Sequence, residues 1–590
     1  MKGSEFSSAG NLKGTYSFPD NFNPELNKPA KVSGAEAIIK SLLMEGVETI
    51  FGYPGGAIMP VYDALYDYRD KVNHVLTRHE QGAVHAAQGY ARASGKVGVC
   101  FATSGPGATN LITGIADAFI DSTPLVCITG QVGSFLLGTD AFQETDVVGI
   151  SMPVTKWNYQ VTNAEEIPTA IANAFYIAKS GRPGPVVIDI TKDAQFSEFV
   201  YYYQSAKKIR SYQPKPKLNI EQVKAAATLI NKSEKPLVLF GQGVSLSGAD
   251  TEFRKFIEKT GIPAAWTLLG ISSLPTTHPL NVGMLGMHGN YGPNKLTNEA
   301  DLIIAIGMRF DDRVTGDLKR YATNAKIIHI EIDDAEIDKN VKTDVAVHAD
   351  AKEALTSLVN FVDKKNHEKW LSSFNTLYDE EFDQVISKEI KPDAGKLRMA
   401  EVVKKLSEKT PDDTIVVTDV GQHQMVTARY FEHSGKSLSI TSGGLGTMGF
   451  CLPASMGAKI GSTDKSVLAI IGDGGFQMTI QELATIAQYK IGIKIVVLNN
   501  QFLGMVRQWQ ELFFESRYSF TEMTNPDFVK IADGFGIPGR RLDQREHLDS
   551  SIDEMLSTEG PYFLEVMVEQ EDNVFPMVPT GASVSEIRLS

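Results

Sequence analysis

Cysteine is scarce in this sequence: 590 residues contain three, Cys100, Cys127 and Cys451, all inside apolar stretches. Their spacing matches neither a zinc motif nor the dense framework of a disulfide-stabilised secreted domain. We therefore expect three reduced thiols in the core of a protein from a reducing compartment. The sequence also lacks an uninterrupted apolar run of about 20 residues, the length that a membrane helix needs.

Positive charge is in the minority, with 57 Lys and Arg against 71 Asp and Glu and a net charge of −14. This balance argues against non-specific binding to nucleic acid or to an anionic membrane. The first 30 residues contain no arginine and no apolar core of the kind found in transit and signal peptides. We expect residues 1–30 to form a flexible N-terminal arm. We expect a bacterial cytoplasmic protein, with a processed organellar form as the alternative.

Short apolar runs alternate with helical patterns in three blocks, at 31–195, 218–362 and 396–590, the last including a C-terminal tail. This alternation predicts an α/β protein built from three doubly wound parallel-sheet domains. The links 201–217 and 363–396 are charged and contain proline, so we expect surface connections there.

One apolar run, SVLAIIGDGGFQM, ends abruptly in Gly472-Asp473-Gly474. A helical pattern follows, and a second apolar run ends at Asn499-Asn500, with 24 residues between Gly474 and Asn499. Because ligands of doubly wound sheets bind beyond the carboxyl ends of strands, Asp473 and Asn500 are expected to converge. A hard cation such as Mg²⁺ takes one or two protein oxygens and completes its shell with phosphate oxygens. We expect the glycines to let a diphosphate group approach the backbone. A helix beginning after Gly475 would favour this anion at its N-terminus.

Taken alone, Gly-Asp-Gly is more often a simple turn, since both residue types favour turns. The paired motif at this spacing resembles the signature of thiamine-diphosphate enzymes. In that superfamily a carboxylic acid beside the cofactor's pyrimidine drives the proton shift that activates the cofactor. The resemblance assigns this role to Glu80, in RHEQGA, and implies that it is buried. An exposed glutamate at a helix start is the alternative.

A narrower resemblance covers the chain from about residue 31 to the C-terminus. The segments GYPGGAIMPVYDAL, GTDAFQE, LGMHGNYGPN, GMRFDDRVTG, DVGQHQM, SGGLGTMGF and LNNQFLGMVRQWQ are similar, in order, to the catalytic subunits of acetohydroxyacid (acetolactate) synthases. These enzymes decarboxylate pyruvate and join the product to a second pyruvate or to 2-ketobutyrate, in branched-chain amino-acid synthesis.

The resemblance implies a role for individual residues. The catalytic set is Glu80, Gln143, Gly56 and Phe142. Thiamine diphosphate would contact Gly421, Gln422, His423, Gly446, Met448, Gly472, Asp473, Gly474, Gly475, Asn500, Phe502, Gly504 and Met505. The Mg²⁺ ligands would be Asp473, Asn500 and the backbone carbonyl of Phe502.

Substrate contacts would come from Arg313, Trp509 and, less closely matched, Lys215. A salt bridge from Arg313 to Asp311 or Asp312, and a core position for Trp509, are the alternatives.

The middle block resembles the family's FAD domain, although it lacks the full G-x-G-x-x-G fingerprint. The residues carried over to FAD are Gly241, Gly243, Met287, His288, Gly307, Arg309, Asp311, Glu331 and Asp350. Strand-end glycines that bind no nucleotide are the alternative.

The three domains are thereby a pyrimidine-binding domain, a central FAD domain and a diphosphate-binding domain. The resemblance further implies a homodimer or a dimer of dimers with sites across the interface, and leaves open a small regulatory subunit. A pyruvate oxidase, a simple 2-ketoacid decarboxylase and an inactive binding protein are the competing hypotheses. Intact Glu80 and Asp473 argue against the last.

Overall fold

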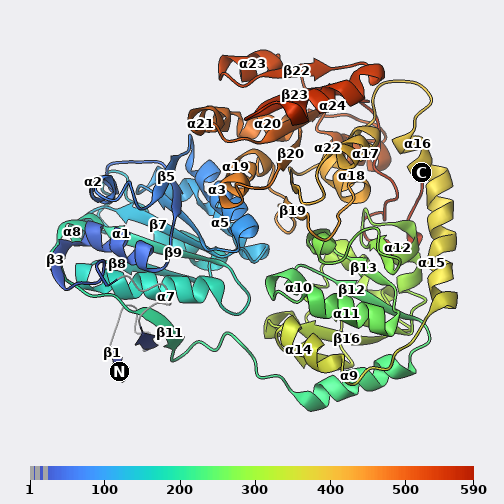
Figure 1. Cartoon of the computed structure of the whole chain (residues 1–590), viewed down its shortest axis with the longest axis horizontal. Helices are drawn as coiled ribbons and strands as arrows, with labels where there is room; N and C mark the ends of the chain where they lie inside the picture. Colours follow the sequence, from blue (N-terminus) through green and yellow to red (C-terminus); the bar gives the residue numbers. More distant parts are fainter. Residues whose placement is uncertain (1–4, 7–13, 18–23) are drawn as a thin grey trace.

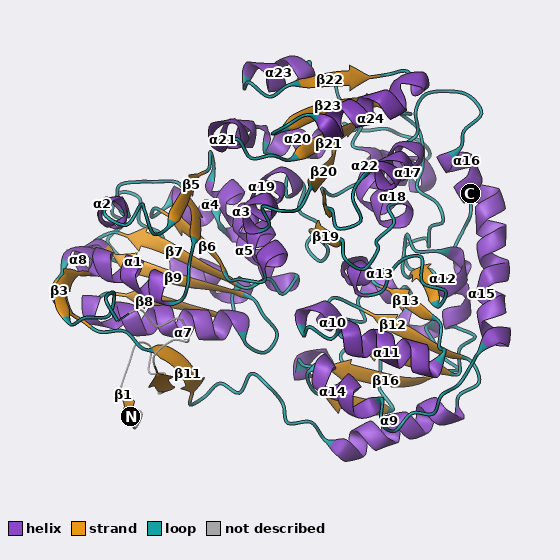
Figure 2. Cartoon of the chain, viewed as in Figure 1, coloured by secondary structure: helices purple, strands orange, loops and turns teal. Residues whose placement is uncertain are grey.

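The computed structural model describes residues 5–6, 14–17 and 24–590, which form three lobes that follow one another along the chain (Figure 1). Each lobe contains a six-stranded sheet with helices on both faces (Figure 2). Every strand pair in these three sheets is parallel. The predicted α/β class with three doubly wound parallel sheets is confirmed.

The first sheet has the order β5-β4-β6-β7-β9-β8. Its strands are β4 (Thr49–Gly52), β5 (Asn73–Leu76), β6 (Gly98–Ala102), β7 (Leu125–Gln131), β8 (Trp157–Val161) and β9 (Pro185–Thr191). Its main helices are α1 (Gly34–Met44), α2 (Met59–Tyr66), α3 (Glu80–Ser94), α5 (Ile112–Ile120) and α7 (Ile167–Lys179). Counted from β4, the order is second, first, third, fourth, sixth, fifth, so the winding reverses between β4 and β6.

The third sheet, in the order β19-β18-β20-β21-β23-β22, repeats this arrangement strand for strand. Its strands are β18 (Ile415–Thr418), β19 (Leu438–Thr441), β20 (Val467–Gly472), β21 (Lys494–Asn499), β22 (Gly539–Leu542) and β23 (Tyr562–Met567). Its helices include α17 (Met399–Lys409), α18 (Gln422–Tyr430), α19 (Cys451–Gly461), α20 (Asp473–Met478), α21 (Leu483–Tyr489), α22 (Gly504–Phe513), α23 (Phe528–Gly534) and α24 (Leu548–Ser557). The winding reverses between β18 and β20.

The middle sheet differs, with the order β14-β13-β12-β15-β16-β17. Its strands are β12 (Pro236–Phe240), β13 (Ala264–Trp266), β14 (Asn281–Met284), β15 (Leu302–Ile306), β16 (Lys326–Glu331) and β17 (Val345–His348). Its helices include α9 (Ile220–Lys232), α11 (Asp250–Thr260), α12 (Tyr291–Thr297), α13 (Asp312–Thr315) and α14 (Ala351–Leu358). The order third, second, first, fourth, fifth, sixth is that of dinucleotide-binding folds, whose ligand lies at the reversal, here between β12 and β15.

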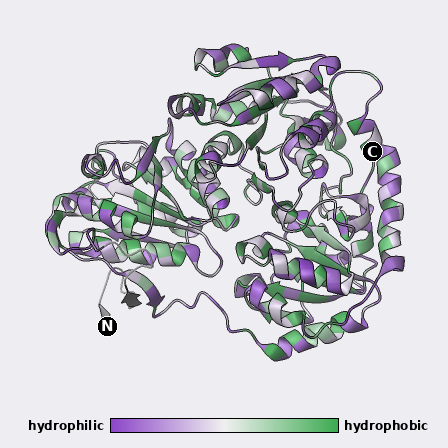
Figure 3. Cartoon of the chain, viewed as in Figure 1, coloured by the Kyte–Doolittle hydropathy of each residue, from purple (hydrophilic) through white to green (hydrophobic). Residues whose placement is uncertain are grey.

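Hydrophobic residues, green in Figure 3, make up much of the strands, and their side chains form the buried core. One core cluster runs without interruption from the first domain into the third, across the packed helices α3 and α19. Glycines permit this close approach, because a Cβ on Gly89 would lie 1.9 Å from the Ala454 carbonyl oxygen. Cys100, Cys127 and Cys451 are free and buried in this cluster, as expected.

The two links predicted as surface connections are more ordered than expected. In the first, Tyr201 and Tyr203 are fully buried, and Ser205–Ile209 forms strand β11. The second contains α15 (Glu368–Glu381), a π-helical turn (Phe382–Ile386) and α16 (Ser387–Ile390), with Trp370 buried against the middle domain. Charge and proline content did not predict this burial, because an amphipathic segment carries charged residues on one face and buried apolar residues on the other.

Much of the predicted N-terminal arm, residues 1–4, 7–13 and 18–23, lies outside the described residues. Within the described part, β2 (Gly14–Ser17) pairs antiparallel with β11 and with β1 (Glu5–Phe6). Asn27 is buried and its side-chain amide donates to the Tyr203 carbonyl at 3.0 Å. The described part of the chain contains no helix that is long and apolar enough to cross a membrane.

Candidate active site

A small cavity of about 60 Å³ lies where β18, β20 and β21 end. It lies at the reversal of the third sheet, where a doubly wound fold binds its ligand. Twelve residues predicted to contact thiamine diphosphate line it: Gly421, Gln422, His423, Met448, Gly472, Asp473, Gly474, Gly475, Asn500, Phe502, Gly504 and Met505. The thirteenth, Gly446, lines the larger cavity next to it.

Asp473 is the acidic residue of this small cavity. It is buried, and burial raises the pKa of its carboxyl to about 6. One carboxylate oxygen accepts a hydrogen bond from the Asn525 side chain at 2.6 Å. Helix α20 begins at Asp473, three residues before the predicted start after Gly475, so Gly474 and Gly475 belong to its first turn.

Asn500 follows β21 and is also buried in the small cavity. Its side-chain oxygen accepts from the Phe502 backbone N–H at 3.2 Å. Among the described residues, no group of three or more His, Cys, Asp and Glu side chains could hold a metal by itself. One carboxylate with neutral oxygens instead suits Mg²⁺ that shares its coordination shell with phosphate.

His423 supplies an unpaired polar atom to the same cavity. It lies in the first turn of α18, and burial lowers its pKa to about 3, so the ring is neutral. Its Nε2 atom is buried without a hydrogen-bond partner. Since buried polar atoms are normally paired, this atom indicates a position that a polar ligand completes. The glycine lining, the single carboxylate and this orphan nitrogen together fit a diphosphate with its metal.

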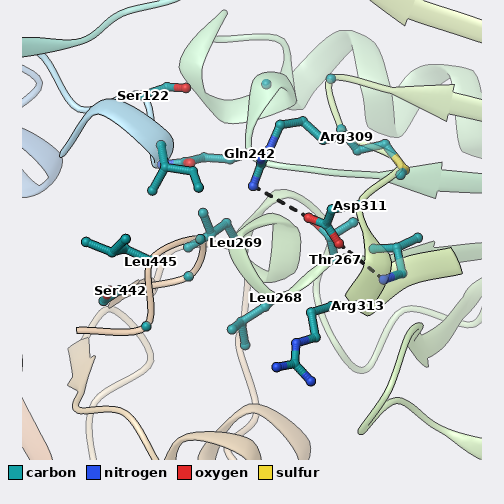
Figure 4. A pocket seen from close by; sticks show the side chains of 18 of the residues that line it. Ser122, Gln242, Thr267, Leu268, Leu269, Arg309, Asp311, Arg313, Ser442 and Leu445 are labelled. Carbon is teal, nitrogen blue, oxygen red and sulfur yellow. Dashed lines mark hydrogen bonds and ion pairs between the residues drawn. The ribbon is translucent and has the colours of Figure 1, made fainter. Parts of the chain in front are cut away.

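A second cavity of about 760 Å³ is lined by residues from all three domains (Figure 4). Eight of the nine residues predicted to contact FAD line it: Gly243, Met287, His288, Gly307, Arg309, Asp311, Glu331 and Asp350. The ninth, Gly241, does not. A side chain has no room at Gly241, because a Cβ there would lie 2.5 Å from the Gly307 carbonyl oxygen.

Polar groups of this large cavity are partly paired with one another. Arg309 lies 3.5 Å from Asp311, the contact drawn in Figure 4. Burial raises the pKa of Glu331 to about 7 and lowers that of His288 to about 3. The Nδ1 atom of His288 is buried without a partner. A carboxyl that titrates near neutrality and a neutral imidazole suit a ligand rich in hydroxyl groups, as a flavin dinucleotide is.

Arg313 and Trp509 line the large cavity together, with the guanidinium 6.0 Å from the centre of the indole ring. The Arg313 Nε lies 3.9 Å from Asp312, but both side chains are largely exposed, so this ion pair contributes little. Asp311 pairs with Arg309 instead. Trp509 is partly exposed, which contradicts a core position.

Lys215 lines neither cavity. Its exposed ammonium group lies 3.8 Å from Asp350, which does line the large one.

The remaining predicted residues form a separate group at the end of the first sheet. Glu80 opens α3, is buried as expected and accepts from the Asn110 side chain at 3.0 Å. An exposed helix-start glutamate is therefore excluded. Gln143 has a φ of +59° and its backbone packs on Gly105. A side chain at Gly56 would meet no atom within 4 Å, and Phe142 is 87% exposed. None of these four residues lines either cavity.

Two polar contributors escaped the sequence analysis. Arg182 lines the large cavity and binds Asp333 at 3.0 Å and Glu336 at 3.1 Å, joining the first and middle domains. The sequence feature that could have indicated Arg182 is its position as a cation within the turn-forming segment Gly-Arg-Pro-Gly. Asn525 bonds Asp473 and Asn499 from a loop 26 residues further along, and no local pattern indicated it.

Comparison with known families gives three matches in the order of the domains. They are the N-terminal TPP binding domain, the central domain and the C-terminal TPP binding domain of thiamine pyrophosphate enzymes, at residues 32–150, 223–358 and 419–566. The chain is 46% identical to the acetolactate synthase isozyme 2 large subunit of Escherichia coli, over 94% of this chain and 99% of that protein. The chain belongs to the acetolactate synthase large subunits.

Other members of this family are similarly close. The large subunit of Lactococcus lactis is 44% identical over 95% of this chain and 97% of its own length. That of Corynebacterium glutamicum is 45% identical over 95% and 91%. The predicted family is confirmed, and with it a thiamine-diphosphate-dependent enzyme. Both TPP-binding domains of the family are present in one chain, each carrying one of the two groups of residues described above.

Proposed function

We propose that the chain decarboxylates pyruvate and joins the two-carbon product to a second pyruvate or to 2-ketobutyrate, giving 2-acetolactate or 2-aceto-2-hydroxybutyrate. These are the products of the first common step toward valine, leucine and isoleucine. The observation that carries this proposal is the contact between the two cavities. Five residues line both: Val420, Gly421, Met448, Met505 and Val506. A cofactor held in the small cavity would therefore adjoin the cavity that Arg313 and Trp509 line.

The small cavity would hold the diphosphate end of the cofactor. Asp473, Asn500 and the Phe502 carbonyl would share a Mg²⁺ ion with phosphate oxygens, which suits the single carboxylate there. Met448, at the boundary of the cavities, would support the cofactor as an apolar wall. When bound, thiamine diphosphate supplies the nucleophilic carbon and the electron sink that decarboxylation of a 2-keto acid requires.

The Glu80 carboxyl would move the activating proton at the other end of the cofactor. Within one chain, Glu80 lines neither cavity, so we propose that a second copy supplies it. Exposed apolar side chains support this: in the first domain Phe142, one of the four predicted catalytic residues, is 87% exposed, and Phe135 is 78% exposed. Val506, which lines both cavities, is 49% exposed. Joining such surfaces buries apolar area in a homodimer or a dimer of dimers.

Arg313 would bind the carboxylate of the acceptor keto acid, because its side chain is exposed and its ion pair with Asp312, at 3.9 Å, is weak. Trp509 would form the wall that selects the acceptor. Gln143, Gly56 and Phe142 would approach the reacting centre from the second copy, and Lys215 would lie at the mouth of the large cavity.

FAD would occupy the large cavity. The dinucleotide-type strand order of the middle sheet, the volume of about 760 Å³ and the unpaired His288 nitrogen support this. We further propose the domain boundaries 31–195, 218–362 and 396–590, and a bacterial cytoplasmic location. A small regulatory subunit is a proposed partner, because the relatives are named large subunits.

The test is product formation from pyruvate with thiamine diphosphate, Mg²⁺ and FAD, under air and under nitrogen. We expect acetolactate in both atmospheres, without oxygen consumption beyond a trace. Acetate or acetyl phosphate formed only with oxygen would identify an oxidase instead. Release of acetaldehyde alone would identify a simple decarboxylase that lacks an acceptor site.

A further inference from the structure

The loop after β19, residues 442–448, forms part of the wall between the two cavities. Ser442, Gly443, Gly444, Leu445 and Gly446 line the large cavity. Met448 lines both. The loop is rich in glycine, and within it the Ser442 hydroxyl accepts the Thr447 backbone N–H at 2.8 Å. Ser442 is itself bonded from outside the loop, and further outside contacts help to hold the position of Met448.

Those contacts come from α5 of the first domain. Asp121 follows directly after α5. Its two carboxylate oxygens accept hydrogen bonds from the backbone N–H groups of Gly443 at 2.8 Å and Gly444 at 2.7 Å. Asp117, one turn earlier, accepts hydrogen bonds from the Ser442 hydroxyl and, at 3.1 Å, from the Thr447 hydroxyl. Two carboxylates thus bind both ends of the loop.

Arg92, near the end of α3, completes the arrangement. Its guanidinium donates to the Thr441 carbonyl at 2.6 Å and lies 3.8 Å from Asp121, and both side chains are buried. Burial raises the pKa of Asp117 and raises that of Asp121 to about 6, while Arg92 and the loop donors oppose this rise. Hydrogen bonds to ionised groups in such a setting are stronger and more directional than neutral ones.

We propose that Asp117 and Asp121 are positioning residues: they clamp the loop 442–447 in the shape that cofactor binding requires. The first domain would then act twice, once by offering Glu80 to a second copy and once by shaping the cofactor site of its own chain. This inference rests on the proposed function, since it assigns the wall to bound cofactors.

Glu45 provides a matched control. Its carboxylate is buried, accepts from the Tyr203 and Ser205 hydroxyls at 2.8 and 2.7 Å, and lies 3.6 Å from the Lys179 ammonium. The numbers of donors and cations are thus the same as at Asp121, but Glu45 lines neither cavity and touches no part of the loop. Glu45→Gln therefore measures what losing a buried, bonded charge does by itself.

The experiment compares the full-length wild type, Asp121→Asn and Glu45→Gln by titration with thiamine diphosphate plus Mg²⁺ and with FAD, followed by fluorescence. We expect Asp121→Asn to weaken both affinities by about tenfold or more, because the amide cannot accept from both loop N–H groups with full charge. At saturating cofactor its kcat should stay close to that of the wild type. Glu45→Gln should lower stability and leave both affinities unchanged.

Hydrogen exchange of the loop amides, measured without cofactors, tests the clamp separately. We expect faster exchange at 442–447 in Asp121→Asn and in the milder Asp117→Asn, and no change in Glu45→Gln. If Asp121→Asn fails to fold, Asp117→Asn carries both measurements. Unchanged exchange, or unchanged cofactor affinities beside faster exchange, would overturn the proposal. A wild type that binds neither cofactor would overturn the proposed function instead.

Discussion

The two TPP-binding domains have the same strand order, yet among the described residues the small cavity lies at the strand ends of the third domain, and the four predicted residues of the first line neither cavity. In the third domain, residues from the ends of β18, β20 and β21 surround about 60 Å³. In the first, the corresponding end carries Glu80 beside an open Gly56 and an exposed Phe142. Equal topology places residues at the same edge of the sheet, but loops decide whether that edge is a pocket or a surface. Under the proposed function, this edge of the first domain meets a second copy of the chain.

The largest effect on cofactor binding is expected from removing the Asp473 carboxylate, which lies in the small cavity of the third domain. Asp473→Asn should weaken binding of thiamine diphosphate with Mg²⁺ by more than about 100-fold, beyond the 10–100-fold typical of an outer-shell partner. The amide keeps the shape but lacks the charge that attracts the metal. Fluorescence titration measures this, with the exposed Asp464→Asn as control. Wild-type affinity in Asp473→Asn would remove it from the metal site.

Glu80→Gln tests the residues at the end of the first sheet. It should lower turnover without weakening cofactor binding. We expect cofactor affinity to be retained and turnover to fall about 10²–10⁴-fold, the usual contribution of a general acid–base group. Steady-state acetolactate formation at saturating cofactor measures the loss. Gln81→Ala, its partly exposed neighbour, is the control. Normal turnover in Glu80→Gln would mean that another group moves the proton.

Mixing the two inactive variants tests whether the halves meet between chains. A hybrid dimer of Asp473→Asn and Glu80→Gln has one site with both substitutions and one with neither. Random exchange makes about half of the dimers hybrid, so about a quarter of wild-type activity should return. Activity of mixtures after subunit exchange measures this. An absence of recovery, with hybrids detected by mass, would mean that each chain builds its own site.

The free energy of unfolding should depend on pH through the neutral His423, which lines the small cavity. Its folded-state pKa of about 3 lies below the unfolded value of 6.5, so the unfolded chain binds more protons between these values. Stability therefore falls as pH falls below 6.5, by about 2 kcal/mol at pH 5. Urea unfolding at pH 7.5 and 5 should show this loss reduced in His423→Gln. The exposed His547→Gln should retain the full loss, and equal losses in all three proteins would contradict the assignment.

The smallest effect concerns the acceptor pocket. Trp509→Leu should shift product formation away from 2-ketobutyrate, by a few-fold to about tenfold, because pocket shape contributes modestly to selection between apolar groups. Competition between pyruvate and 2-ketobutyrate measures the product ratio. Phe513→Leu changes a ring 5.5 Å from Trp509 that does not line the cavity, and serves as control. A constant ratio in Trp509→Leu would assign selectivity elsewhere.

Local pattern located the strands, because a buried parallel strand must be apolar along its whole length. The runs ending at Gly472 and Asn499 are strands as predicted, and Asp473 and Asn500 lie at the same sheet edge. The helix start at Asp473 was less predictable. So was the division of the helical segment between these strands into α20 and α21. Glycine weakens a helical pattern without preventing the turn, so boundaries depend on packing.

The links were the clearest failures. Segments 201–217 and 363–396 have the composition of surface connections, yet they bury Tyr203 and Trp370. An amphipathic segment exposes most of its charge and buries a few large side chains, so average composition does not reveal its packing.

The sequence by itself determined the three alternating sheets, the strand-end glycines and acids, and the family. These depend on periodicity and on motifs within one strand–helix–strand unit. The tertiary structure alone decided which strand ends share a cavity. It joined Arg182 to Glu336, brought Asn525 to Asp473 and set Asp121 against Gly443, pairs separated by up to hundreds of residues. It also left Glu80 outside both cavities, because close packing of α3 on α19 fixes where that edge of the first domain faces.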